Sequence, residues 1–300
     1  MPFPIHPKSP ALKSHAGPVH VVTYNSNGQY ALTGGQDKKI LLWNPNTGSL
    51  VKQYISHGYE VLDIAVAHDN ATFASCGGDR SVFFWDVMTA TVLRKLSGHT
   101  ARVNSVALNA DASVMVSGSY DSTVRLWDCK SGSAKPIQVL ADAKDSVADV
   151  LVAGHEIITG SVDGTLRVYD VRKGQLTADL VGHPITSITV STDATSLLVS
   201  TLDDTIRLMD RANGSLLQTF KGHKNSEYRV RSCFGENETY VVSGSETGRV
   251  YVWDFLTGRI VHELRGHAGK VVSDVAYHPR EGQHQMLSCG TDGTVQVWTT

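Results

Sequence analysis

The sequence contains no long apolar run and few cysteines. No stretch approaches the ~20 apolar residues that a transmembrane helix needs. The first residues, MPFPIHPK, lack the apolar segment of a secretory signal peptide. The four cysteines, at 76, 129, 233 and 289, form no CxxC pair, so we expect buried free thiols in a reducing compartment. These absences predict a protein of the cytoplasm and nucleus without a membrane segment.

The sequence also lacks an excess of charge of either sign. Lysine and arginine together number 27, against 29 for aspartate and glutamate, which leaves a net charge of -2. A protein held to nucleic acid mainly by phosphate contacts would carry a surplus of basic residues. The sequence shows neither the His and Cys spacing of a metal site nor a cofactor-binding motif. We therefore expect its partners to be other proteins, with no nucleic acid, membrane, metal or cofactor bound.

What the chain does contain is a repeat. Three histidines each precede a tryptophan by 28 residues, and the pairs recur every 42 residues: His15 with Trp43, His57 with Trp85, and His99 with Trp127. A large residue followed by Asp, Asn or Thr ends seven units, at 43–44, 85–86, 127–128, 169–170, 209–210, 253–254 and 298–299. Each unit has the ~40–45 residues of a four-stranded blade. Within a unit, apolar residues alternate with polar ones between turns rich in Gly, Asp and Asn, and no long stretch has the period of a helix. The sequence predicts an all-β, seven-bladed β-propeller.

The two ends of the chain predict how the ring closes. The last unit begins at His267 and has three strands before the sequence stops at Thr300. Residues 10–14, PALKS, stand where a fourth strand belongs, but no three strands precede them. We predict that residues 10–14 pair with the blade formed by 267–300 and leave no open sheet edge. Residues 10–300 then form one propeller, and 1–9, with prolines at 2, 4 and 7, form a short tail.

Four units carry a complete set of His, Ser or Thr, Asp and Trp. These sets are His15, Thr33, Asp37, Trp43; His57, Ser75, Asp79, Trp85; His99, Ser117, Asp121, Trp127; and His267, Ser288, Asp292, Trp298. His, Ser and Asp also form hydrolytic triads, but an enzyme needs one activated nucleophile, whereas a repeated fold needs the same contact in every blade. We predict a structural chain in which Asp accepts from His, His meets the hydroxyl, and the hydroxyl accepts from the indole. The sets therefore do not predict an enzyme.

Three consecutive units have incomplete sets. The replacements are Ala141 and Tyr169 for His and Trp in the fourth unit, Val199 and Met209 for the hydroxyl and Trp in the fifth, and Thr247 for Asp in the sixth. We expect this side of the ring, from about residue 142 to 254, to depend more on apolar packing. We also expect it to be the more mobile side.

Candidate binding residues lie beside the repeated sets. Loops that lead into the innermost strands, and turns before the third strands, should gather on one rim of the central channel, where rigid blades present variable loops. Tyr and Arg dominate many interfaces, and the loop after His223 is stretched, because Trp253 follows His223 by 30 positions, against 28 in the first three units. The candidates are Tyr59, Glu60, Arg102, Tyr120, Lys224, Glu227, Tyr228, Arg229 and Lys270. The alternative is a solvated rim with the tyrosines packed over neighbouring blades.

The repeated residues resemble those of the WD-repeat propeller family. Within that family, SHGYEVLD at 56–63, GSVDGTLRVYDVR at 160–172 and GHKNSEYR at 222–229 are similar to the mitogen-activated protein kinase organizer group of scaffolds. The resemblance implies a non-catalytic adaptor, a monomeric ring within larger complexes, that assembles kinase-cascade components and is also found among spliceosome-associated proteins of pre-mRNA splicing. An alternative comes from YDVR at 169–172, which resembles the W-D-x-R element that docks some propellers on cullin ubiquitin ligases, and it would make Arg172 the contact of a substrate receptor.

Overall fold

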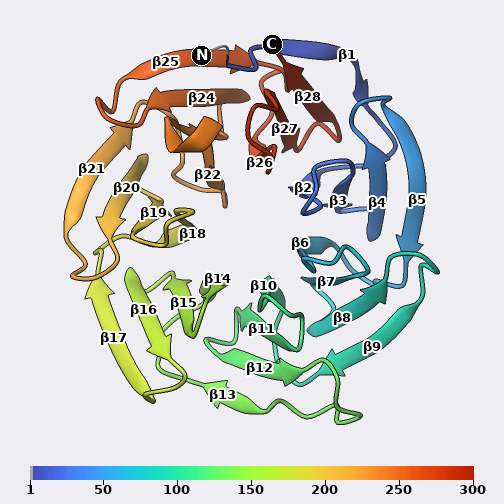
Figure 1. The fold of residues 1–300 in the computed structure, drawn as a ribbon, viewed down its shortest axis with the longest axis vertical. Helices are drawn as coiled ribbons and strands as arrows, with labels where there is room; N and C mark the ends of the chain where they lie inside the picture. The colour runs from blue at the N-terminus through green and yellow to red at the C-terminus, as the bar shows by residue number, and fades with distance from the viewer. Residues whose placement is uncertain (1–2) are drawn as a thin grey trace.

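The computed structural model describes residues 3–300 as a ring of seven four-stranded antiparallel sheets (Figure 1). In six sheets the first strand lies nearest the central channel and the last strand lies at the circumference, and in the seventh sheet β1 takes the outer place. The predicted all-β, seven-bladed propeller is therefore confirmed. The one helical segment within residues 3–300 is the short 3-10 turn η1 (Glu236–Glu238), so no helix there is long and apolar enough to cross a membrane.

Each blade is one sheet, numbered here from the first complete repeat. Blades one to three contain β2 (Val19–Tyr24), β3 (Ala31–Gly35), β4 (Lys39–Asn44), β5 (Ser49–Ile55); β6 (Val61–Val66), β7 (Thr72–Gly77), β8 (Ser81–Asp86), β9 (Val92–Ser97); and β10 (Val103–Leu108), β11 (Val114–Ser119), β12 (Val124–Asp128), β13 (Gln138–Leu140). Blades four and five contain β14 (Val147–Ala153), β15 (Glu156–Ser161), β16 (Thr165–Asp170), β17 (Gln175–Leu180); and β18 (Ile185–Val190), β19 (Ser196–Thr201), β20 (Thr205–Asp210), β21 (Leu216–Lys221). Blades six and seven contain β22 (Ser232–Gly235), β23 (Tyr240–Ser243), β24 (Arg249–Asp254), β25 (Ile260–Arg265); and β26 (Val272–Tyr277), β27 (Gln285–Gly290), β28 (Val295–Thr299), with β1 (His6–Leu12).

The N-terminal strand closes the ring. β1 pairs antiparallel with β28, so that it supplies the outermost strand of blade seven, and Figure 1 shows the two ends of the chain meeting there. The predicted bounds were wrong: the strand begins at His6 instead of Pro10 and ends at Leu12. Pro7 and Pro10 are tolerated in it because a strand at the outer edge of a sheet has a side that needs no ladder hydrogen bonds.

Residues 3–9 do not form the predicted tail. Residues 6–9 belong to β1, and the Phe3 side chain is buried between blades six and seven. Its ring lies 4.9 Å from that of Tyr240 and 5.8 Å from that of Tyr277, centroid to centroid. Burial of a Phe side chain is worth about 1.5–3 kcal/mol, which explains why this segment packs on the ring despite its prolines. Residues 1 and 2 lie outside the described residues.

The core is divided among the blade interfaces. One cluster of buried apolar residues fills each of the seven interfaces between adjacent blades. Between blades one and two, for example, Leu32 and Ile40 pack against Phe73 and Trp85. Because a blade buries its faces only by stacking on its neighbours, both faces of its middle strands are apolar, as in the run VFFW at 82–85.

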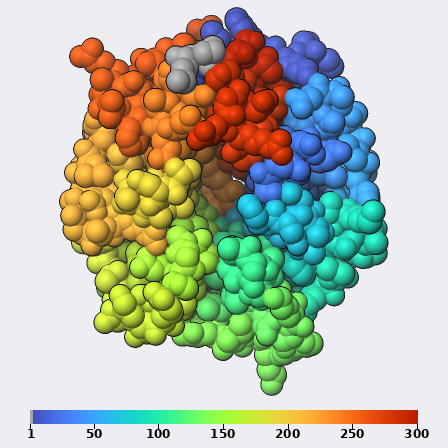
Figure 2. Space-filling view, in the orientation of Figure 1, coloured from blue at the N-terminus to red at the C-terminus, as the bar shows by residue number. Residues whose placement is uncertain are grey.

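The antiparallel order gives the ring two faces that carry different loops and turns. The loop into each first strand and the turn between the second and third strands lie on one face, which we call the upper face. The two remaining turns of each blade lie on the opposite, lower face. The channel runs between the faces, and its opening is visible at the centre of Figure 2. A cavity of about 760 Å³ occupies it, and turn residues of the lower face, such as Glu238 and Arg280, line its mouth.

Candidate functional site

The repeated His, hydroxyl, Asp and Trp residues are joined by hydrogen bonds in four blades. In blade three, His99 Nε2 lies 2.8 Å from Ser117 Oγ, and the Trp127 indole donates to the same oxygen at 2.9 Å. The other ring nitrogen of His99 lies 2.9 Å from an Asp121 carboxylate oxygen. The same contacts recur in blades one, two and seven through His15, Thr33, Asp37, Trp43; His57, Ser75, Asp79, Trp85; and His267, Ser288, Asp292, Trp298.

The burial and the hydrogen bonds of these sets indicate a structural role. The Ser117 side chain is fully buried, and its oxygen is already shared by the imidazole and the indole, so no substrate can reach it. Burial would raise the pKa of Asp121, but hydrogen bonds from His99, Thr123 and the Thr100 amide outweigh burial and hold that pKa well below its usual range. The ionised carboxylate thereby ties the turn before the third strand to the loop before the first strand.

Blades four and five fasten the same turn with arginine. Arg167 lies 2.7 Å from Asp163, and Arg207 lies 2.6 Å from Asp203, both pairs four residues apart. Burial would raise the pKa of each carboxyl, but the hydrogen bonds from arginine lower it to about 2 in both cases. In these two blades a guanidinium on the third strand therefore fastens the turn, a contact that the expectation of greater apolar packing did not include. The expected greater mobility of this side stays a prediction.

Blade six keeps its histidine but not the partners of that histidine. Both ring nitrogens of His223 are buried without a hydrogen-bond partner among residues 3–300. The Trp253 indole donates to the Lys221 carbonyl at 2.9 Å, and its ring lies edge-on to His223 at 5.3 Å. Burial lowers the pKa of His223 to about 4, so the ring is neutral at pH 7.

A glutamate takes over the fastening of the stretched loop in blade six. Glu246 Oε1 accepts hydrogen bonds from three successive backbone amides, those of Ser226, Glu227 and Tyr228. Burial would raise the pKa of Glu246, but these backbone hydrogen bonds outweigh it and lower the pKa. The loop that carries the candidate residues Glu227 and Tyr228 is therefore held by an ionised carboxylate.

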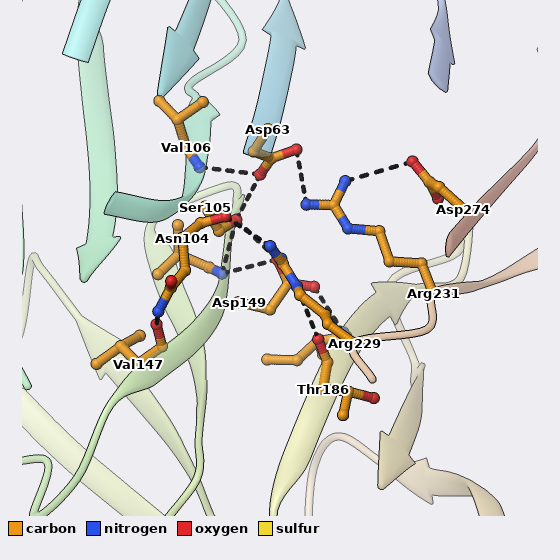
Figure 3. A network of polar contacts seen from close by, with 12 residues as sticks. Asp63, Asn104, Ser105, Val106, Val147, Asp149, Thr186, Arg229, Arg231 and Asp274 are labelled. Carbon is orange, nitrogen blue, oxygen red and sulfur yellow. Dashed lines mark hydrogen bonds and ion pairs between the residues drawn. The ribbon is translucent and has the colours of Figure 1, made fainter. Parts of the chain in front are cut away.

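Three aspartates face the central channel at equivalent positions (Figure 3). Asp63, Asp149 and Asp274 are each the third residue of an innermost strand, in blades two, four and seven. Each carboxylate accepts a backbone amide from the innermost strand of the following blade, those of Val106 at 3.0 Å, Ile188 at 2.8 Å and Val22 at 3.0 Å. The aspartates thus join adjacent blades from inside the ring.

Two arginines of blade six balance this charge from the segment before β22. Arg231 forms ion pairs with Asp63 at 2.7 Å and Asp274 at 3.5 Å, although the geometry at its Nη2 is not that of a hydrogen bond. Arg229 pairs with Asp149 at 3.0 Å and donates to the Thr186 carbonyl at 3.1 Å. The structure therefore corrects the expectation for Arg229: its side chain turns into the channel and is no rim residue, because buried carboxylates require cations.

The other rim candidates lie on the upper face, in the loops and turns that define it. Tyr59, Tyr120 and Tyr228 expose 61, 55 and 50% of their surface, so at least half of each side chain is open to solvent. Two of them carry a cation over the ring: Lys38 over Tyr59 at 5.9 Å, and Arg102 over Tyr120 at 5.0 Å. The charged candidates are exposed at Arg102, Lys224, Glu227 and Lys270 and half-buried at Glu60. Sequence reasoning missed Lys38, which occupies the same turn in blade one as Tyr120 in blade three.

Comparison with known proteins decides the family. A family model described as "WD domain, G-beta repeat" matches seven segments, 8–44, 48–86, 90–128, 134–170, 174–210, 214–254 and 258–299. The chain belongs to the WD40 repeat family. These segments end at the β-strands that carry the Trp position, so each WD40 repeat contributes the last strand of one blade and the first three of the next.

Curated relatives cover nearly the whole WD40 ring. A protein named "WD repeat domain-containing protein 83" from Homo sapiens is 54% identical over 94% of this chain and 88% of its own length. Its namesake in Danio rerio is 51% identical over 99% of this chain and 96% of its own length. The Dictyostelium discoideum homolog is 33% identical, with 96% of each chain covered.

The WD40 architecture is in general a non-enzymatic scaffold that binds other proteins. Within residues 3–300, no group of three or more His, Cys, Asp or Glu side chains is placed to hold a metal ion. The element YDVR lies at the end of β16 and in the turn that follows it, on the lower face, where Arg172 is exposed.

Proposed function

We propose that this WD40 propeller is a non-catalytic scaffold that binds partner proteins through its upper face. The observation that carries the proposal is the pair of exposed tyrosines, Tyr59 and Tyr120, each lying beneath a cation that comes from another loop. Such pairs present rigid aromatic surface with a charge beside it, the chemistry that dominates many protein interfaces. The fastened blades beneath them hold these side chains in place without taking part in contact.

We further propose that the assembled proteins are components of a mitogen-activated protein kinase cascade, with a second setting in the spliceosome during pre-mRNA splicing. The support is the resemblance of residues 56–63 and 222–229 to the organizer group of scaffolds. These two stretches also supply Tyr59 and Tyr228 to the upper face. A scaffold with both roles would be present in cytoplasm and nucleus.

Affinity purification of the tagged full chain with mass spectrometry tests this proposal. Recovery of kinase-cascade or spliceosomal proteins is expected, and loss of these proteins on Tyr59→Ala with Tyr120→Ala would tie them to the upper face. The Arg172→Ala variant is the matched control on the lower face. Recovery of a cullin adaptor that disappears with Arg172→Ala would contradict the proposal and favour a ubiquitin-ligase substrate receptor.

A further inference from the structure

A second concave site opens on the lower face, between blades five and six. It is a groove of about 430 Å³, within the ~300–1,000 Å³ range of ligand-binding clefts. The buried side chain of Leu208 forms part of its floor, and Phe255 forms part of its wall. Leu217, on the outer strand β21, and Leu256, in the turn after β24, stand at its edges.

These edge leucines are unusually open to solvent for residues beside a groove. Leu256 exposes 82% of its surface, and Leu217 exposes 52%. A single exposed leucine on a protein surface needs no explanation, but apolar side chains gathered around a concavity mark interaction sites. The groove therefore offers apolar surface that nothing in residues 3–300 covers.

The same groove is negatively charged. Its charged lining residues are Asp193 and Glu238, and no lysine, arginine or histidine of residues 3–300 lines it. The nearby Arg211, from the turn after β20, is already paired with Glu156 at 2.6 Å. The two carboxylates are therefore available to balance a positive charge brought by a partner.

One wall of the groove is a strained turn that fixes Glu238 in place. Glu236, Asn237 and Glu238 have φ values of 23°, 47° and 60°, which are unfavourable for residues with a side chain. Glu236 is anchored to blade seven through His284 at 2.7 Å, and Glu238 is anchored to blade five through the Thr192 hydroxyl at 2.9 Å. Strained backbone persists where its surroundings determine it and often marks functional sites. The turn thus presents a preorganised carboxylate at the groove.

We propose that this groove is a second docking site, which takes a partner segment whose apolar side chain fills the space between Leu217 and Leu256 and whose adjacent Arg or Lys pairs with Glu238 and Asp193. The inference goes beyond the proposed binding at the upper face. A scaffold that joins two proteins needs two surfaces that do not overlap, and a site on the opposite face of a rigid ring meets that need.

The test uses three short fluorescein-labelled peptides and the full chain, with binding measured by fluorescence anisotropy. The first peptide has adjacent leucines flanked by arginines, the second has glutamates in place of the arginines, and the third has alanines in place of the leucines. The leucine–arginine peptide should bind, and each of the other two should bind at least about tenfold more weakly. Failure of all three peptides to bind, or equal binding of the first two, would overturn the proposal.

Matched variants locate the peptide on the protein. Leu217→Ser with Leu256→Ser should weaken binding by about tenfold or more. The control is Val51→Ser with Met88→Ser, because these residues hold the equivalent places at the interface of blades one and two, at 48 and 84% exposure. Binding should survive in the control, and an equal loss in both variants would show adhesion to any exposed apolar side chain and overturn the proposal.

A charge variant separates docking from folding. Glu238→Gln keeps an oxygen that can accept from Thr192 while it removes the negative charge. The variant should bind the leucine–arginine peptide several-fold more weakly and lose most of the salt dependence of binding. Tyr120→Ala, on the upper face, should leave both the affinity for this peptide and its salt dependence unchanged. Unaltered affinity and salt dependence in Glu238→Gln would contradict the assigned role of Glu238.

Discussion

Arg231 forms an ion pair with Asp63 at 2.7 Å, although the two residues belong to blades six and two, on opposite sides of the ring. Figure 3 shows the guanidinium between Asp63 and Asp274, which belongs to blade seven. The ring is therefore braced across its channel as well as fastened blade by blade. Because Arg231 joins three blades that share no sheet, a substitution at Arg231 should affect the stability of all three blades.

Removal of Arg231 should destabilise the whole ring. In Arg231→Met, Asp63 and Asp274 stay in the channel without their cation, and an uncompensated buried charge costs about 3–5 kcal/mol. Urea unfolding followed by tryptophan fluorescence measures the loss. The control is Arg265→Met on the exposed side of β25, where a change within about 0.5 kcal/mol is expected. Equal stability of the two variants would refute the brace.

The hydrogen-bonded sets should contribute stability without contributing partner selectivity. Asp121→Ala leaves the buried His99 ring without its acceptor, at about 1–3 kcal/mol for an unsatisfied buried group, and it also removes the acceptor of the exposed Thr100 amide. We expect a lower melting temperature by differential scanning calorimetry and an even reduction in all partners. Asp111→Ala, whose pair with Lys130 is exposed, should melt within a degree or two of the parent protein. An unchanged melting curve for Asp121→Ala would defeat the assignment.

Two histidines at the same place in the repeat should respond differently to the same substitution. His99→Phe removes the hydrogen bonds of both ring nitrogens and should lower the free energy of unfolding by about 1–3 kcal/mol. His223→Phe removes two unpartnered buried nitrogens and keeps the ring beside Trp253, so the free energy of unfolding should stay equal or rise. Chemical denaturation measures the free energy of unfolding of both variants. Similar decreases in the two variants would show that His223 forms stabilising contacts of its own and would contradict this prediction.

The Asp163–Arg167 pair should make stability depend on pH in the acid range. The pKa of Asp163 falls from 3.8 to about 2 on folding, so its contribution is present above pH 4 and is lost as pH falls towards 2. The stability difference between the parent protein and Asp163→Asn should therefore be larger at pH 6 than at pH 3. Urea unfolding at both values measures the difference, and a constant difference would contradict the ion pair.

The blades and their fasteners were predictable because they repeat. Equal spacing of His57 and His99 from their tryptophans indicated one unit with one role, and the geometry of each set follows from the side chains alone. Residues 3–9 were misread because prolines argue against a strand, whereas an outer edge strand tolerates them. The Arg167 and Arg207 pairs were missed because the expectation followed the replaced members of each set instead of the retained Asp.

The channel brace had a signal that sequence reasoning passed over. Asp63, Asp149 and Asp274 each interrupt an apolar innermost strand at its third residue, and a charge at such a position requires a partner. The partner itself was not predictable from the pattern, because Arg229 and Arg231 stand in the stretched loop of blade six, where no other repeat provides a template. That loop supplies both a rim tyrosine and the channel cations.

The central claim, that the upper face binds partners while the fasteners hold the ring, is tested most directly by Arg102→Glu combined with Tyr228→Ala. Both side chains are exposed, so the melting temperature should match that of the parent protein. Quantitative mass spectrometry of purified complexes should then show loss of partner proteins at equal amounts of folded scaffold. Full recovery of every partner by the variant would contradict the account.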